Sequence, residues 1–110
     1  MKYFDSGVEV KGGCYHEFVK GKWDRKTFWS DYSLILDDDI LNDLNVGGLF
    51  YSVHPGYGPY GPTEFTVEQW AAVRKKAAET GGEVELLIQE LADWLGDSSN
   101  GGIAFTSLGV

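Results

Sequence analysis

Hydrophobic residues recur with a helical period between residues 83 and 95. They stand on one face of a helix because they fall at positions i, i+3, i+4, i+7, i+10 and i+11. The members of this face are Val84, Leu87, Ile88, Leu91, Trp94 and Leu95. Gly96 follows directly, and glycine is the residue that most often ends a helix. The pattern predicts a helix that ends at Leu95.

A second helix is predicted from Thr66 to about Glu79. Thr66 and Gln69 have the spacing of a capping box, in which each side chain accepts a backbone N–H of the other residue. Apolar residues continue through this segment until the sequence Thr80-Gly81-Gly82, which is expected to end the helix.

The first part of the chain predicts strands. Residues 2–10 and 14–19 flank the turn sequence Lys11-Gly12-Gly13, so a β-hairpin is expected over residues 2–19. Residues 27–36 fit either a strand pair or a buried helical turn. Their β-branched and aromatic content favours extended structure that ends in Ser33–Leu36.

The sequence Asp37-Asp38-Asp39 predicts the start of a short helix. An Asp cap followed by acidic residues complements the positive end of the helix dipole. Its apolar stripe is Ile40, Leu41 and Leu44, and Asn45 with Gly47-Gly48 is expected to end it. Strands are then expected at Leu49–Val53 and at Ile103–Thr106.

Directly after the first of these strands, residues 55–62 are predicted to form a loop. Its prolines and glycines exclude a helix or a central strand, and it carries Tyr57 and Tyr60. Tyrosines on such a loop suit a contact surface, although they can equally pack back on the sheet.

The expected fold class is α+β. A hairpin is antiparallel by construction, so we expect an antiparallel or mixed sheet with two to three helices packed on one face. The 110 residues suit one domain spanning residues 1–110. A hydrophobic fraction of 43% and an aromatic fraction of 15% support a folded core.

Charge is distributed unevenly along the chain, whose formal net charge is −8. Residues 1–26 hold six basic and four acidic residues, whereas residues 27–110 hold three basic and thirteen acidic ones. From Thr27 to Val73 there are seven acidic residues and no Lys or Arg, interleaved with nine aromatic residues. Direct binding of nucleic acid or of an anionic membrane is disfavoured, since both require clustered basic residues.

No metal or cofactor is expected from the sequence. Cys14, the single cysteine, excludes an internal disulfide and a cysteine-based zinc site, and His16 and His54 add too few ligands. The cluster Asp37–Asp39 with Asp43 lacks the ligand order of a calcium loop. The N-terminal sequence has no apolar signal segment, and no stretch is long enough to span a membrane, so a cytoplasmic protein is expected.

Catalytic patterns are sparse. On a strand, Ser52 and His54 would point the same way, as would Cys14 and His16, and nucleophilic catalysis needs such a pair with an orienting group. No nucleophile elbow or oxyanion-hole motif accompanies either pair. A non-enzymatic protein is therefore expected, and a small hydrolase that uses His16 or His54 is the alternative.

Size, acidity and aromatic content together resemble the immunity proteins of bacterial toxin systems. That resemblance implies a small protein that neutralises a basic toxin, such as a nuclease, by pairing acidic side chains with its Lys and Arg and filling pockets with aromatic anchors. The expected partner-contacting residues are Asp37, Asp38, Asp39, Asp43, Tyr57 and Tyr60. A DNA mimic and an adaptor that binds a basic partner remain alternatives, and monomer or homodimer stays open.

Overall fold

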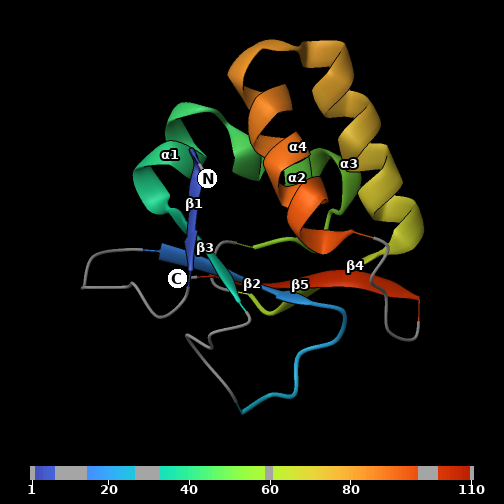
Figure 1. Ribbon diagram of the computed structural model, residues 1–110. Helices are drawn as coiled ribbons and strands as arrows, with labels where there is room; N and C mark the ends of the chain where they lie inside the picture. Colours follow the sequence, from blue (N-terminus) through green and yellow to red (C-terminus); the bar gives the residue numbers. More distant parts are fainter. Residues whose placement is uncertain (1, 7–14, 27–32, 59–60, 97–101, 110) are drawn as a thin grey trace.

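The computed structural model describes residues 2–6, 15–26, 33–58, 61–96 and 102–109. Its strands are β1 (Phe4–Ser6), β2 (Tyr15–Lys20), β3 (Leu34–Asp37), β4 (Thr63–Thr66) and β5 (Ile103–Gly109). Its helices are α1 (Asp38–Asp43), α2 (Val46–Val53), α3 (Val67–Thr80) and α4 (Gly82–Leu95). The strands form one antiparallel sheet in the order β1-β3-β2-β5-β4, and the helices lie on one face of it (Figure 1). The α+β class is confirmed, with four helices in place of two to three.

The predicted hairpin over residues 2–19 is wrong. β1 and β2 do not pair with each other, because β3 lies between them and pairs antiparallel with both. Ile35 of β3 faces Asp5 on one side and Glu17 on the other. The expected turn at Lys11-Gly12-Gly13 lies outside the described residues. A local turn signal cannot reveal that a later segment will enter between two strands.

The predicted strand at Leu49–Val53 is a helix. Asn45 takes a left-handed conformation with φ of 54°, and α2 begins at the next residue. Val46 and Phe50, four positions apart, are fully buried and form the inward face of α2. Gly47 lies inside the helix, where a Cβ would stand 3.3 Å from Leu41 Cδ2. Gly47 therefore allows α2 to pack closely on Leu41. It lies inside α2, whereas the sequence analysis expected it to help end the preceding helix.

Helices α3 and α4 match their predictions closely. Thr66 Oγ1 accepts the Gln69 N–H at 3.0 Å and Gln69 Oε1 accepts the Thr66 N–H at 3.0 Å, which completes the capping box. Gly81 and Gly96 follow the two helices with φ of 69° and 57°. The terminal strand is also present, and β4 is an element that the sequence patterns did not indicate.

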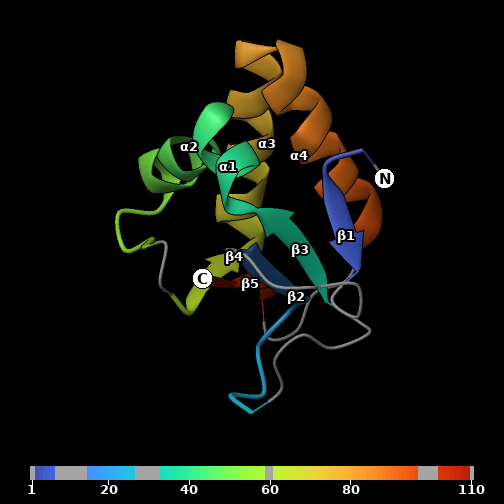
Figure 2. The ribbon, with the colours of Figure 1, turned by 90° about the vertical axis from the view of Figure 1, so that its left-hand side faces the viewer.

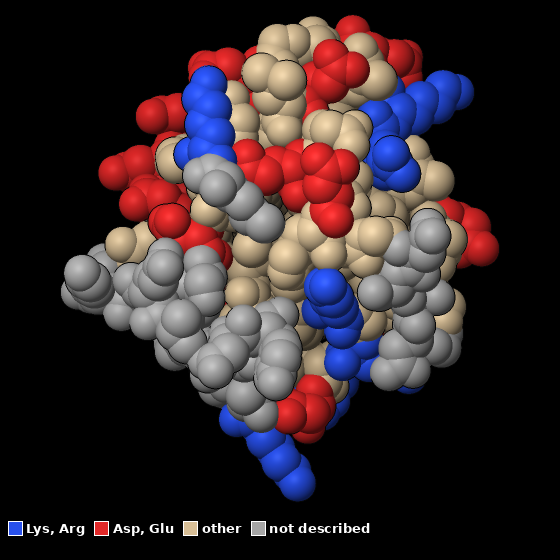
Figure 3. Space-filling view, in the orientation of Figure 1, with Lys and Arg blue, Asp and Glu red and all other residues tan. Residues whose placement is uncertain are grey.

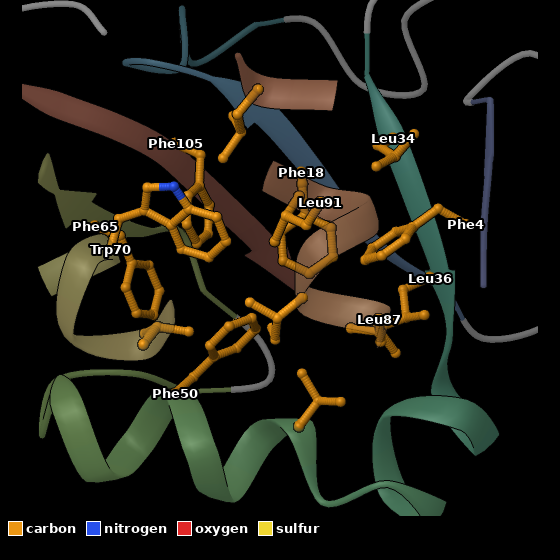
Figure 4. Close-up of a cluster of buried hydrophobic side chains, with 14 of the residues drawn as sticks. Phe4, Phe18, Leu34, Leu36, Phe50, Phe65, Trp70, Leu87, Leu91 and Phe105 are labelled. Atoms are coloured by element: carbon orange, nitrogen blue, oxygen red, sulfur yellow. The ribbon is translucent and has the colours of Figure 1, made fainter. Parts of the chain in front are cut away.

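The core fills the space between the sheet and the helices (Figure 4). Phe65 of β4 and Phe105 of β5 stack with ring centroids 4.7 Å apart, and Trp70 of α3 meets Phe105 edge-on at 5.3 Å. Phe18 of the central strand contacts Phe50 of α2 edge-on at 6.1 Å. Such edge-on and offset contacts add to the free energy gained from burying large rings.

One carboxylate of α4 holds the first strand in place. Glu90 accepts backbone N–H groups from Lys2, Tyr3 and Phe4, each at 3.0 Å in its shortest contact. Turned by 90°, the ribbon shows β1 beside α4 (Figure 2). Glu90 therefore links α4 to the edge strand of the sheet.

Candidate partner-binding surface

The acidic residues that were predicted as partner contacts lie in α1 (Asp38, Asp39 and Asp43) or cap its N-terminus (Asp37). Asp37 caps the helix, and its Oδ1 accepts the Asp39 N–H at 2.8 Å. Asp38 and Asp39 occupy the first turn, where negative charge interacts favourably with the helix dipole. The last turn carries no basic residue. The predicted helix start is therefore confirmed, including its cap.

Asp39 and Asp43 are exposed and lie on the same side of α1, because residues four apart share a face. No described Lys or Arg forms an ion pair with Asp37, Asp39 or Asp43. Like charges at this spacing destabilise a helix by about 0.2–0.5 kcal/mol. We refer to Asp37, Asp39 and Asp43 as the acidic face of α1.

Asp38 has a different role from its neighbours. Its Oδ1 accepts a hydrogen bond from Nε2 of His16, on β2, at 2.7 Å, and its Oδ2 accepts one from the Asn42 amide at 3.2 Å. The His16 side chain is fully buried, whereas that of Asp38 is 34% exposed. Asp38 thus joins α1 to the central strand, and its charge is partly used inside the protein.

Tyr57 is not a surface anchor. Only 8% of this residue is exposed, and its ring packs edge-on against Phe50 with centroids 5.4 Å apart. Burial, with a smaller contribution from the charge of Asp38, raises the pKa of Tyr57 to about 12. For Tyr57 the alternative is correct, in which the loop tyrosine packs back on the protein. Tyr60 lies outside the described residues.

An exposed aromatic residue is found instead on α2. Tyr51 is 59% exposed and stands next to the buried Phe50. The sequence did not single it out, because residues 49–53 read as a strand. With Val46 and Phe50 recognised as one helical face, position 51 would have been placed outside the core.

The residues considered for catalysis are engaged in structural contacts. Ser52 Oγ donates to the Leu49 carbonyl at 2.7 Å. His54 Nδ1 accepts the Gly56 N–H, and Nε2 donates to the Glu64 carbonyl, each at 3.1 Å. Ser52 belongs to a helix and not to a strand, so the expected alignment with His54 does not exist. Cys14 lies outside the described residues.

The described part of the chain contains no cluster of three or more His, Cys, Asp or Glu that could hold a metal ion. Within the same residues, no helix combines the length and apolar character needed to cross a membrane.

Charge is unevenly distributed on this face. Acidic side chains are more numerous over the upper, helical part, which also carries basic side chains at its left and right margins, and further basic side chains lie at the lower end (Figure 3). That end is formed by the segment that follows β2, with exposed Lys22, Arg25 and Lys26.

Comparison of the chain with protein family models, with curated proteins and with solved structures gives no match.

Proposed function

We propose that this protein is a non-enzymatic binding protein that captures a basic protein partner through the acidic face of α1, and that it acts as an inhibitor of the immunity type. The observation that carries the proposal is that Asp37, Asp39 and Asp43 have no Lys or Arg partner among the described residues. Carboxylates without an ion-pair partner among the described residues can pair with Lys and Arg of another protein without breaking such a pair.

The mechanism is electrostatic capture followed by occlusion. Acidic side chains speed the encounter with a basic surface, and the rate falls as salt screens the charges. Inhibition follows if the basic surface is the partner's own substrate-binding site. The burial of His16 and the contacts made by both nitrogens of His54 favour binding over the hydrolase alternative.

The first experiment is capture from the native cell lysate at low salt, followed by elution at high salt and mass spectrometry. One basic protein at near-stoichiometric yield is expected. Its association rate with the triple variant Asp37→Asn, Asp39→Asn and Asp43→Asn should fall about tenfold or more at low salt, because steering is lost. Asn keeps the capping function at position 37.

The matched control neutralises three exposed acids elsewhere, with Glu68→Gln, Glu85→Gln and Asp93→Asn. Both triple variants have the same net charge, so a local surface is separated from overall charge. Equal association rates for the two variants would contradict the assignment to α1. If the captured protein is a nuclease, its activity should be lost at one equivalent of this protein, whereas an adaptor leaves the activity intact.

A further inference from the structure

A surface hollow lies between α2 and the turn end of the α3–α4 hairpin. Its volume is about 510 Å³. One wall comes from the α1–α2 corner and α2, and the other comes from residues around the turn that joins α3 to α4. α2 packs directly on α3, and both ribbon views place these elements side by side (Figures 1 and 2).

Apolar side chains line both walls. Leu44 and Leu49 on one side and Val84 on the other are half-buried, so each packs against the core and still faces the hollow. Gly48 is exposed between them, and a Cβ there would come within 2.4 Å of the Asn45 side chain. The missing side chain at Gly48 keeps the hollow open.

The rim of the hollow is acidic. Glu79 lines it, and the exposed residue Asp43 directly precedes the lining residue Leu44. Lys76 also lines the hollow, and long lysine stems cover apolar surface while their charge stays in water. The two carboxylates of Asp43 and Glu79 outnumber the one ammonium group of Lys76, which favours a positively charged ligand.

We propose that this hollow docks an amphipathic helix of a basic protein partner. Apolar side chains of that helix pack between Leu44, Leu49 and Val84, and its Lys or Arg residues face Asp43 and Glu79. A helix that lies in a groove uses residues three and four positions apart as anchors, which fits two apolar walls below an acidic rim. Charge favours a basic partner over a second copy of this chain, because two molecules of net charge −8 repel each other.

This inference rests on the proposed function and extends it. α1 ends at Asp43, and the hollow begins at Leu44, so the acidic face of α1 and the hollow are continuous. The acidic face attracts the partner, and the hollow supplies the apolar contacts that hold it. Charged rims mainly set association rates, while buried anchors set dissociation rates.

The test uses a synthetic peptide of Lys and Leu in an amphipathic helical pattern. About 14 residues give a helix about 21 Å long, enough to follow α3. A scrambled peptide of the same composition keeps the charge without an apolar face, and a Glu/Leu peptide keeps the apolar face with reversed charge. Binding is measured by titration at low salt, and the contacted residues are mapped by amide chemical shifts.

The matched variants are Ser52→Trp, which fills the hollow from an exposed position of α2, and Ala78→Trp. Ala78 is also exposed on a helix, but it lines a different hollow, between α3 and α4, that Arg74 and Lys75 border. Thermal unfolding confirms that each variant folds. Should Ser52→Trp fail to fold, Glu79→Lys replaces it and reverses one charge of the rim.

We expect the Lys/Leu helix to bind with shifts at Leu44, Leu49 and Val84. Ser52→Trp should weaken binding about tenfold or more, as for the loss of an interface anchor, and Ala78→Trp should leave it unchanged. Equal binding of the helical and scrambled Lys/Leu peptides, mapped to α1 alone, would overturn the hollow and leave capture by the acidic face intact. No binding of either basic peptide would count against both proposals, and equal binding of the Glu/Leu helix would overturn the basic partner.

Discussion

Asp38 Oδ1 lies 2.7 Å from Nε2 of His16, and this contact joins the first turn of α1 to the central strand of the sheet. His16 is fully buried, and its Nδ1 has no hydrogen-bond partner among the described residues. The Asp38 contact is therefore the one hydrogen bond of this ring among the described residues, and it links the first turn of α1 to the sheet.

Asp38→Ala is expected to destabilise the protein by about 1–3 kcal/mol, the cost of leaving a buried polar group without its partner. Asp39→Ala, one position along, removes an exposed carboxylate and is expected to change the free energy of unfolding by no more than about 0.5 kcal/mol. Urea unfolding of the two variants beside the wild type makes the comparison. Equal losses would show that the His16 contact contributes nothing beyond the helix dipole.

Glu90→Ala is expected to release β1 from α4. Three backbone N–H groups, of Lys2, Tyr3 and Phe4, lose their acceptor. A loss of about 1–3 kcal/mol is expected, because hydrogen bonds to charged groups are the stronger ones. Amide hydrogen exchange should accelerate at Tyr3 and Phe4 first. Glu85→Ala, on the exposed side of α4, serves as the control and should leave those two amides protected.

Ionisation of Tyr57 is expected to lower the stability of the folded protein at alkaline pH. Its pKa is raised from 10.0 to about 12, so the folded state disfavours ionised Tyr57. A raised acid pKa means that the stability is full below the unfolded pKa and is lost as pH rises from about 10 to about 12. Tyr57→Phe should remove this loss, so that the stability difference between variant and wild type grows in favour of the variant above pH 10.

The control for Tyr57→Phe is the same comparison at neutral pH. The hydroxyl of Tyr57 has no hydrogen-bond partner among the described residues, so the substitution should be close to neutral there. A stability difference that stays constant from neutral pH to above pH 12 would contradict the assignment of the raised pKa to Tyr57.

Thr66→Ala is expected to cost about 0.5–2 kcal/mol, the usual range for losing an N-cap side chain. The hydroxyl accepts the Gln69 N–H, and no methyl group can replace it. Thr66→Ser keeps the oxygen and should remain close to the wild type. Chemical unfolding followed by circular dichroism measures both, and a serine variant as unstable as the alanine variant would point to lost packing of the threonine methyl group.

How far the fold could be predicted depended on whether the deciding contacts were local. α3 and α4 were predicted because the residues that mark their ends depend on contacts within one helical turn. These residues are Thr66, Gln69, Gly81 and Gly96. The first hairpin was wrong because the pairing of β1 depends on β3, about thirty positions further along in the register Asp5–Ile35. α2 was missed because Gly47 and Gly48 suit the end of a helix, and the aromatic and β-branched residues of Leu49–Val53 suit a strand when tertiary burial is ignored.

The residues of the candidate surface show the same difference between local and long-range contacts. The cap at Asp37 and the exposure of Asp39 and Asp43 follow from neighbouring residues, and the sequence indicated them. Asp38 differs because its partner, His16, is 22 positions away on another element. The burial of Tyr57 depends on Phe50 and Phe65, which no periodicity in the loop could indicate.

The position of β5 has a consequence for how the protein forms during synthesis. This strand is the last in chain order, yet it lies between β2 and β4. Until residues 103–109 leave the ribosome, the strand that pairs with both β2 and β4 is missing. The ring of Phe65 then has no Phe105 ring to stack on. A nascent chain that lacks residues 103–109 therefore exposes the apolar surface that β5 and Phe105 cover in the folded protein.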